Sequence, residues 1–587
     1  MMDITRTSLG VISNDGKNLY VNWRVTGTNQ VWKIPGALRF PIQLTGGEES
    51  TNISSLSIDG KWLYLSRDSK GDEYTGIYRQ STNGGVLEPI IRKEKVKASL
   101  QWVSSDNRSI YYRANDIDPK NFSLYKYDLR SKKAELLVDK PGYWFLEEVA
   151  DDGRVLVGRS ITNIASEYFL LNEKTKELKP LIGQGEEEEY TVRFGSKSDE
   201  YIVQTNKFGE YRQLYSFRNG KLNKITNEKY NVEYFSMDRD RTRIQYGVNE
   251  NGYYRAHAMD ARTFKSLTLP KFKNADHVYF GFTSRNGRYS TLGVETAKSP
   301  RTNFVYDWKT GRYQQWTTAN HPEIDTTEFA ADKLEYYESH DGVKIPMLVR
   351  RPTKCFKQVC PVIVQFHGGP ESLSYPGFSP TQQLYIDEGF VMVRPNIRGS
   401  DGFGKSWLNS DNGPKRLDVI TDIRDAAVWI KKNWSKNGVV PKVGIMGGSY
   451  GGYATLVGMT MYAGHYDAGV ASVGMSSLVT FLKNTADYRR KLREAEYGFL
   501  DKDMEALEKL SPINYLDKIQ DPLMIIHGAN DPRVPAGEAI QIHDAMEKKG
   551  IPAELILFAD EGHGVRKREN RVLKTGHTIR FFNTHLK

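Results

Sequence analysis

The sequence contains few of the features that mark several classes of protein. Only two of its 587 residues are cysteine, which excludes a disulfide-rich scaffold and a zinc site built from several cysteines. No apolar run approaches the roughly 20 residues needed to span a bilayer. The first residues, Met1 to Arg6, lack the apolar core of a signal peptide. We therefore expect no membrane span and no targeting segment in the chain as given.

Charge of one sign is not concentrated anywhere along the chain. Lys and Arg number 82 and Asp and Glu number 72, which gives a net charge of +10, and the basic residues are dispersed. A dispersed excess is not the basic arm or patch that points to a polyanionic partner, so we expect no nucleic-acid binding. The 39% apolar and 26% charged residues are ordinary for a soluble globular protein. The length predicts at least two domains.

The two cysteines, Cys355 and Cys360, lie in one short stretch before an apolar strand. They are either unrelated thiols in a connecting loop or a disulfide that ties this loop. Without the bond, the default expectation is a cytoplasmic protein. A disulfide would instead indicate an oxidising compartment, such as the periplasm or the exterior of the cell.

A sequence pattern in which a turn precedes a strand recurs through the first half of the chain. Its copies begin at Ser13, Ser57, Ser104, Ala150, Ser196, Ser236 and Ser284. Each copy places Asp, Asn or Gly in a turn beside an apolar strand, as a hairpin requires. A β-sandwich would also contain such hairpins, but seven units at a spacing of about 45 residues favour the blades of a closed ring. We interpret residues 1–320 as a seven-bladed β-propeller.

The pattern changes in the second half, where short apolar strands alternate with helical segments. After a hairpin at 334–351, apolar runs recur at 361–366, 390–393, 443–446, 468–471, 523–526 and 553–558. Buried strands alternating with helices predict an open, mainly parallel α/β sheet over residues 321–587. Chemistry in such sheets gathers in the loops at the carboxyl ends of the strands.

One of these strand-end loops carries a nucleophile motif. The run Val443–Met446 leads directly into Gly447-Gly448-Ser449-Tyr450-Gly451-Gly452, and a helical pattern comes next. This is G-x-S-x-G between a strand and a helix, where small neighbours allow a tight turn and the serine hydroxyl is exposed at its apex. The sequence therefore predicts Ser449 as the nucleophile of an α/β-hydrolase domain.

Two later loops offer the partners that a serine nucleophile needs, in the expected chain order of acid and then histidine. Asp531 follows the strand at 523–526, and His563 follows the strand that ends at 558. We expect His563 to accept the Ser449 proton and Asp531 to orient the imidazole. His527 is the nearest rival histidine and Asp560 the rival acid. Neither has the expected placement.

The strand at 361–366 ends in His367-Gly368-Gly369-Pro370, where hydrolases of this kind supply a backbone N–H to the oxyanion. We expect the backbone N–H groups of Gly369 and Tyr450 to form the oxyanion hole. Chemistry of this kind requires neither a cofactor nor a metal, and we expect none.

A segment from another class of protein also appears. Residues 399–406 match the phosphate-binding pattern G-x-x-x-x-G-K-[ST] literally. That motif needs a strand immediately before it and a long helix after it. Here Pro395 precedes the segment, and Asn412-Gly413-Pro414 interrupts the region where the helix should run. We interpret the match as coincidental.

Four motifs taken together resemble the prolyl oligopeptidase family of serine peptidases. They are Asn396–Ser400, Gly447–Gly452, Asp531–Pro535 and Glu561–Gly564. The motif at 367–370 resembles the acylaminoacyl-peptidase branch more than prolyl oligopeptidase itself. The resemblance covers the whole chain, with a propeller in front of the hydrolase domain. It implies a catalytic triad of Ser449, Asp531 and His563.

The resemblance also implies a mode of substrate binding. Arg533 would contact the substrate backbone near the scissile bond, and the propeller would cover the active site so that only short peptides enter. Met475, Leu478 and Phe481 are candidates for the walls of the S1 pocket, or else ordinary core residues. The acidic run 186–189 is similar to the paired glutamates that hold a free amino terminus in dipeptidyl peptidases of the family, although a solvated loop is the simpler interpretation.

The sequence thus predicts a serine peptidase that acts on short peptides. An esterase using the same triad is an alternative, because ester and amide hydrolysis share an acyl-enzyme intermediate. A propeller interaction module with an inactive hydrolase domain is another, against which the intact motifs argue. The sequence leaves open the end of the peptide that is recognised, the preference at the scissile residue and whether the chain forms a homo-oligomer.

Overall fold

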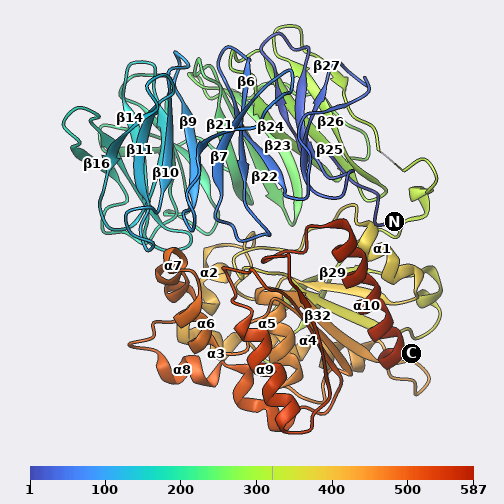
Figure 1. Ribbon diagram of the computed structural model, residues 1–587. Helices are drawn as coiled ribbons and strands as arrows, with labels where there is room; N and C mark the ends of the chain where they lie inside the picture. Colours follow the sequence, from blue (N-terminus) through green and yellow to red (C-terminus); the bar gives the residue numbers. More distant parts are fainter. Residues whose placement is uncertain (320) are drawn as a thin grey trace.

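The molecule consists of two stacked bodies, a ring of β-sheets above an α/β domain (Figure 1). The computed structural model describes residues 1–319 and 321–587. Within residues 1–319 the strands form seven separate sheets, and within residues 321–587 they form one eight-stranded sheet. The seven-bladed propeller and the α/β-hydrolase domain predicted from the sequence are therefore confirmed. No helix in the described part of the chain has the length and apolarity to cross a bilayer.

Each blade is an antiparallel meander of consecutive strands. Blades 1 to 3 contain β1 (Val11–Ile12), β2 (Leu19–Trp23), β3 (Gln30–Ile34), β4 (Ile42–Gln43), β5 (Thr51–Leu56), β6 (Trp62–Arg67), β7 (Gly76–Ser81), β8 (Glu88–Ile91), β9 (Ala98–Val103), β10 (Ser109–Ala114), β11 (Ser123–Asp128) and β12 (Lys133–Val138). Blades 4 and 5 contain β13 (Tyr143–Val149), β14 (Val155–Ser160), β15 (Ser166–Leu171), β16 (Leu178–Ile182), β17 (Thr191–Phe194), β18 (Tyr201–Thr205), β19 (Gln213–Arg218) and β20 (Lys221–Lys224). Blades 6 and 7 contain β21 (Asn231–Met237), β22 (Arg243–Glu250), β23 (Tyr253–Asp260), β24 (His277–Thr283), β25 (Tyr289–Thr296), β26 (Ser299–Asp307) and β27 (Arg312–Gln315).

The recurring sequence pattern corresponds to the turn between the first two strands of a blade. In blade 1, Ser13 Oγ donates to Asp15 Oδ1 at 2.6 Å, and the same carboxylate accepts the backbone N–H of Lys17 at 3.0 Å. Blade 2 repeats this pattern with Ser57 and Asp59. Local side-chain bonds thus fix each turn, which explains why the period was visible in the sequence.

The ring closes through contacts between blades 1 and 7 without a shared strand. Asn303 of β26 donates from its side chain to the backbone oxygen of Ser8 at 2.5 Å, and Asn286 donates to the backbone oxygen of Asn14 at 2.8 Å. Apolar clusters lie between neighbouring blades. One of them joins Tyr111 of blade 3 to Trp144 of blade 4.

The sheet of the α/β domain has the order β28-β29-β31-β30-β32-β33-β34-β35 within residues 321–587. Its strands are β28 (Lys333–Glu338), β29 (Lys344–Arg350), β30 (Val362–Phe366), β31 (Val391–Pro395), β32 (Val443–Gly448), β33 (Ala468–Ser472), β34 (Leu523–Gly528) and β35 (Ala553–Phe558). The β28–β29–β31 pairs are antiparallel and all later pairs are parallel. The apolar runs predicted as strands therefore all lie in this sheet.

Helices pack on both faces of the sheet. They are α1 (Pro380–Asp387), α2 (Lys405–Leu408), α3 (Arg416–Val419), α4 (Asp422–Asn433), α5 (Tyr450–Met459), α6 (Leu478–Asn484), α7 (Asp487–Tyr497), α8 (Met504–Lys509), α9 (Gly537–Lys548) and α10 (Arg568–Leu586). Two apolar clusters form the core, one with α4 and α5 and the other with α1 and α10. The predicted domain boundary at residue 320 lies outside the described residues, between β27 and β28.

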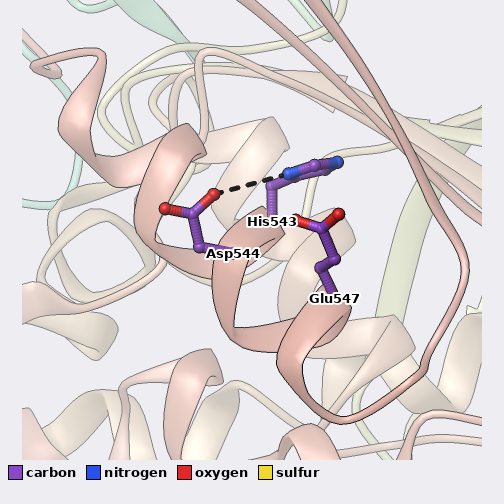
Figure 2. A group of neighbouring side chains, drawn as sticks. All are labelled: His543, Asp544 and Glu547. Atoms are coloured by element: carbon purple, nitrogen blue, oxygen red, sulfur yellow. Dashed lines mark ion pairs between the residues drawn. The ribbon is translucent and has the colours of Figure 1, made fainter.

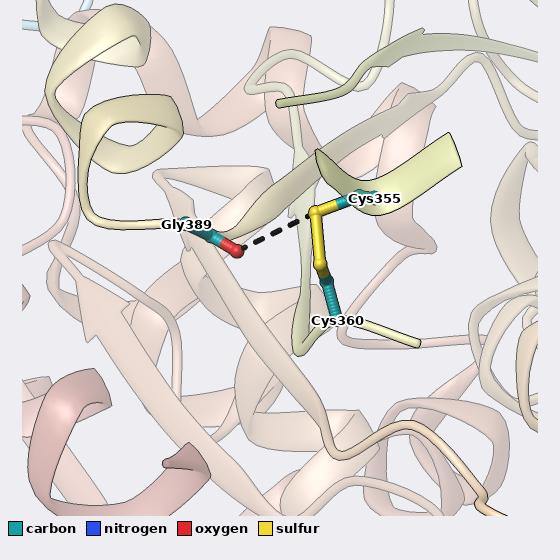
Figure 3. Close-up of a disulfide and its surroundings, with 3 residues drawn as sticks. All are labelled: Cys355, Cys360 and Gly389. Carbon is teal, nitrogen blue, oxygen red and sulfur yellow. Dashed lines mark hydrogen bonds between the residues drawn. A yellow bond between two sulfur atoms is a disulfide. The ribbon is translucent and has the colours of Figure 1, made fainter. Parts of the chain in front are cut away.

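Cys355 and Cys360 are joined by a disulfide in the connection between β29 and β30 (Figure 3). Cys360 is buried at 6% exposure and belongs to the larger apolar cluster of the domain. The Cys355 sulfur lies 3.8 Å from the backbone oxygen of Gly389. The bond therefore ties this connection beside the start of β31.

Ion pairs link the propeller to the α/β domain, and they include the acidic run. Glu188 pairs with Lys405 at 2.6 Å, and Glu189 and Asp401 share Arg212, each at 2.8 Å. The interpretation of 186–189 as a solvated loop is therefore wrong for two of its carboxylates, because they face cations at the domain interface.

Lys405 begins the four-residue helix α2, so the phosphate-loop-like segment at 399–406 lacks the long helix that its motif requires.

Candidate active site

Ser449 occupies the sharp turn between β32 and α5. Its backbone has φ 58° and ψ −120°, a left-handed conformation that is unfavourable for a residue with a side chain. Gly451, in the first turn of α5, packs its Cα against the backbone oxygen of Phe366, where a Cβ atom has no room. This close approach explains why the motif needs glycine beside the serine, and it places Ser449 over the end of β30.

Asp531 and His563 form the predicted acid–histidine pair. The Nδ1 atom of His563 lies 2.7 Å from Asp531 Oδ2. The other carboxylate oxygen, Oδ1, accepts the backbone N–H groups of Arg533 at 2.8 Å and Val534 at 3.1 Å. The Asp531 side chain has 0% exposure. Because backbone N–H groups hold one oxygen of this buried carboxylate, its other oxygen fixes the tautomer and orientation of the imidazole.

The rival residues do not take the positions of His563 and Asp531, although His527 Nε2 lies 3.6 Å from Asp531 Oδ2. His527 lies at 2.8 Å from the backbone oxygen of Val534 through Nε2, so it orders the acid loop. Burial lowers the pKa of His527, which favours its neutral form. Asp560 pairs with Lys567 at 2.7 Å and accepts from Asn570. Neither residue contacts the imidazole of His563 in the described interactions.

The sheet brings the three loops to one edge. Strands β32, β33, β34 and β35 are consecutive and parallel, so their carboxyl ends lie in a row. Backbone bonds join the loops beyond them: Ser449 N–H donates to Ser472 O at 3.0 Å, and Ala529 N–H donates to Phe558 O at 2.9 Å. Ser449, Asp531 and His563 thus follow strands of the same sheet at one edge, and the propeller loop around Gly71 packs against the His563 loop at Gly562.

Glu561 stabilises the loop that contains His563. The sequence motif did not reveal this role. Its buried carboxylate accepts the backbone N–H groups of Arg566 and Lys567, both at 2.9 Å. Its backbone oxygen accepts the N–H of Asn530 at 3.0 Å. Glu561 therefore connects the acid loop to the loop of His563.

The predicted oxyanion donors flank the serine. Tyr450 is the first residue of α5, so its N–H has no acceptor within the helix. On the other side, a Cβ atom added to Gly368 would lie 3.3 Å from Ser449 Cβ, which places the Gly368–Gly369 segment beside the nucleophile. Tyr497 donates its hydroxyl to the backbone oxygen of Gly369 at 3.3 Å and holds this segment.

A buried ionic network lies behind Tyr450, and sequence reasoning missed it. Arg416 has 0% side-chain exposure and pairs with Asp411 at 3.0 Å and with Glu496 at 2.5 Å. Its guanidinium packs over the rings of Tyr450 and Tyr497, at 5.4 and 4.6 Å from the ring centres. Burial raises the pKa of the Glu496 carboxyl well above its ordinary value. The network comes from four separate segments, and no motif spacing could have revealed it.

Arg533 lies at the domain boundary and already has a partner. Its Nε donates to Glu73 of the propeller at 2.7 Å, and Glu73 also pairs with Lys97 at 3.3 Å. Burial opposes ionisation of Glu73, but the Lys97 and Arg533 charges outweigh it and hold the pKa of Glu73 below its ordinary value. The same propeller loop approaches the histidine loop, because a Cβ atom at Gly71 would lie 2.5 Å from Gly562 N.

The predicted S1 residues lie in the core beside the site. Met475, Leu478 and Phe481 are each at most 2% exposed and belong to the apolar cluster that includes Tyr450. Phe481 packs edge-on against Tyr497, with ring centres 5.5 Å apart. This packing is that of ordinary core residues, and a role in forming the S1 pocket stays a prediction.

A group of metal-ligand residues lies on α9, away from this edge. His543, Asp544 and Glu547 project from consecutive turns of the helix (Figure 2), and His543 Nδ1 lies 3.6 Å from Asp544 Oδ1. Asp544 and Glu547 are exposed, and all three come from one surface helix. Such groups are common on exposed helices without a bound ion, and this one is not part of the candidate active site.

The chain is similar to a known protein family and to named proteins from two organisms. The family model described as the prolyl oligopeptidase family matches residues 376–587. The dipeptidyl aminopeptidase BIII of Pseudoxanthomonas mexicana is 39% identical over 95% of this chain and 84% of its own length. The dipeptidyl peptidase family member 6 of Caenorhabditis elegans is 38% identical over 38% of this chain, a match that spans only 30% of the nematode protein.

The architecture also matches solved structures. A structure from a study of two prolyl endopeptidases superimposes with a TM-score of 0.86 over 99% of this chain and 90% of that chain, at 18% identity. At this identity the match supports the fold alone. Because the bacterial relative aligns over nearly the whole length at 39% identity, the chain belongs to the prolyl oligopeptidase family of serine peptidases.

Proposed function

We propose that Ser449, His563 and Asp531 are the catalytic triad of this peptidase and that it cleaves short peptides through an acyl-enzyme. The observation that supports the triad best is the 2.7 Å contact from His563 Nδ1 to the buried Asp531. It fixes the imidazole on the same sheet edge as the strained turn of Ser449. Similar elements position the triad on other α/β-hydrolase domains.

The chemistry follows from these positions. His563 Nε2 removes the proton from Ser449 Oγ, which attacks the carbonyl carbon of the scissile bond. The N–H groups of Gly369 and Tyr450 stabilise the oxyanion of the tetrahedral intermediate. When this intermediate collapses, His563 gives the proton to the leaving nitrogen and the acyl group remains on Ser449. A water molecule, activated by the same imidazole, then releases the acyl product.

The propeller limits which substrates reach the serine. Its loop around Gly71 packs on the loop of His563, and the Glu73–Arg533 pair bridges the two domains beside the acid loop. A folded protein does not fit between such surfaces, whereas an extended peptide needs only a narrow space. We propose that the substrates are short peptides and that they enter when the two domains separate.

We further propose that the enzyme acts at the amino end of its substrates. The relative that matches nearly the whole chain is named as a dipeptidyl aminopeptidase, and the motif at 367–370 resembles the acylaminoacyl-peptidase branch. Release of a dipeptide requires a free amino terminus, and release of an acylated amino acid requires a blocked one. A panel of chromogenic peptides with free and acetylated amino ends separates these modes, and a simple ester of the same acyl group tests the esterase alternative.

A fluorophosphonate probe tests the nucleophile directly. We expect one adduct per chain, on Ser449, and no adduct in Ser449→Ala at unchanged thermal stability. Ser410→Ala is the matched control, because this serine lies in the same domain and donates only to the backbone oxygen of Trp407. Labelling that survives in Ser449→Ala contradicts the assignment.

A further inference from the structure

A cavity of about 520 Å³ lies between the propeller and the α/β domain. Most of its lining comes from blades 1, 2 and 7 of the propeller. The α/β domain contributes Val565 and Arg566, which follow His563 by two and three residues. The cavity therefore adjoins the loop that carries the proposed general base.

The lining of this cavity is cationic. Arg6, Arg24, Arg301 and Arg566 all contribute to it, and the other described residues around it are Asn, Ser, Thr and Val565. No Asp or Glu is among the described residues that line it. Such a wall attracts an anion, because arginine presents several N–H donors to a carboxylate in a fixed planar geometry.

Two of the four arginines are already neutralised. Arg6 pairs with Glu295 at 2.6 Å, and Arg566 binds Asp68 through Nη1 at 2.8 Å. Both carboxylates lie behind the cavity wall and do not line the cavity. These two pairs fix the shape of the wall, and in the described interactions neither carboxylate bonds to Arg24 or Arg301.

Arg24 and Arg301 have no carboxylate partner among the described residues. Arg301 donates from Nη2 to the backbone oxygen of Thr7 at 2.8 Å, and its buried Nε lacks a partner in the described chain. No described hydrogen bond or ion pair occupies the guanidinium of Arg24. Burial and the nearby charge of Arg6 lower the pKa of Arg301, while Glu295 acts in the opposite direction. Burial and the charges of Arg571 and Arg6 lower the pKa of Arg24, although the residue as a whole is exposed at the cavity. An anion in the cavity would offset the repulsion between these two arginines and their cationic neighbours.

From this arrangement we infer that the cavity binds a carboxylate on the leaving side of the peptide substrate, with Arg24 and Arg301 as its ligands. The inference rests on the proposed triad. His563 delivers its proton to the leaving nitrogen, so the leaving segment extends from the scissile bond past the His563 loop, and Val565 and Arg566 lie on that loop. The carboxylate is either the carboxyl terminus of the peptide or an Asp or Glu side chain, because both present the same group.

The test uses the full chain and three peptides with one scissile bond. The first is neutral and amidated at its carboxyl end, the second has a free carboxyl end, and the third is amidated with Glu as the second residue after the scissile bond. We expect the wild type to prefer one or both of the charged peptides by roughly tenfold in kcat/KM, mainly through KM, since a charge-assisted hydrogen bond has about this effect. The second and third peptides distinguish the terminal carboxylate from the side chain.

The variants are Arg24→Gln and Arg301→Gln, with Arg24→Lys to retain charge. We expect both glutamine variants to remove most of the preference for the charged peptides and Arg24→Lys to retain part of it. The matched control is Arg108→Gln, an exposed arginine in a turn of blade 3 that lies outside the cavity. Arg301 also contacts Thr7, so Arg24→Gln decides the outcome if Arg301→Gln unfolds at a lower temperature.

Binding to the full-length Ser449→Ala chain provides a readout that does not depend on catalysis. The labelled charged peptides should bind about tenfold more tightly than the amidated neutral one, and Arg24→Gln in that background should remove the difference. Equal affinity for the three peptides, or an equal loss for all of them in Arg24→Gln, overturns the inference. The inference is also overturned if inorganic phosphate occupies the cavity but the chain shows no preference among the three peptides. If charged peptides bind in this way but no peptide is cleaved, the proposed catalysis fails and the cavity assignment stands.

Discussion

The guanidinium of Arg533 donates from Nε to Glu73 Oε1 at 2.7 Å, across the boundary between the two domains. Arg533 follows the proposed catalytic acid, Asp531, by two residues, whereas Glu73 belongs to the propeller loop that packs on the histidine loop. One ion pair therefore connects the propeller to the residue that we propose contacts the substrate. The Arg533 side chain remains 42% exposed, so part of its guanidinium is free for a substrate carbonyl.

Arg533→Ala should reduce peptide cleavage more than ester cleavage. A peptide presents backbone carbonyls to the guanidinium, while a simple ester has none beyond the reacting group. We expect kcat/KM for a peptide to fall by roughly tenfold or more and that for an ester to change far less. Arg580→Ala is the control, because Arg580 is also ion-paired but lies on the outer helix α10. Equal losses on both substrates would show that Arg533 is purely structural.

His563→Ala should lower turnover by roughly a thousandfold or more, since a serine hydroxyl is a poor nucleophile without a base. Asp531→Asn should also be severely impaired, because the amide no longer stabilises the required tautomer. His543→Ala, on the surface of α9, serves as the matched histidine control. Burst kinetics with an activated ester measure acylation, and near-normal acylation in either triad variant would refute the choice of partner.

Arg416→Met should destabilise the α/β domain by about 3–5 kcal/mol, since it leaves Asp411 and Glu496 buried without their cation. The sign of the pH effect follows from burial, which raises the pKa of both carboxyls above the unfolded values. The folded state then binds more protons than the unfolded state, so stability falls as pH rises. Denaturation of the variant at pH 5 and pH 8, with Arg580→Met as control, should show a larger loss at pH 8. A loss that does not depend on pH would contradict this account.

The parts of the fold that were predictable from the sequence are those fixed by local chemistry. The Ser13–Asp15 and Ser57–Asp59 turns are closed by side chains two residues apart, so their repetition revealed the blades. Ser449, Asp531 and His563 each follow a recognisable strand, and the parallel order of those strands brings their loops together.

The parts that could not be predicted depend on pairs distant in the sequence. Glu73 and Arg533 are 460 residues apart, and Lys405 and Glu188 are 217 apart. Neither pair leaves a local pattern. A solvated loop is therefore the simpler interpretation of the acidic run from the sequence, although Glu188 and Glu189 face cations at the interface.

Cleavage should depend on whether the substrate is folded, because the propeller loop around Gly71 packs on the loop of His563, the proposed general base. We expect a peptide of a few tens of residues to be cut and a native globular protein containing the same segment to remain intact. The Glu188–Lys405 pair is partly exposed at the interface, so Lys405→Gln should ease domain opening and raise kcat/KM for the longest peptides by a few-fold at most. Lys509→Gln, which breaks an exposed pair on α8, is the control. A length series followed by mass spectrometry measures the cutoff in each variant. Rapid cleavage of the native protein by the wild type would contradict the covering role of the propeller, while the triad assignment, which rests on other residues, would be unaffected.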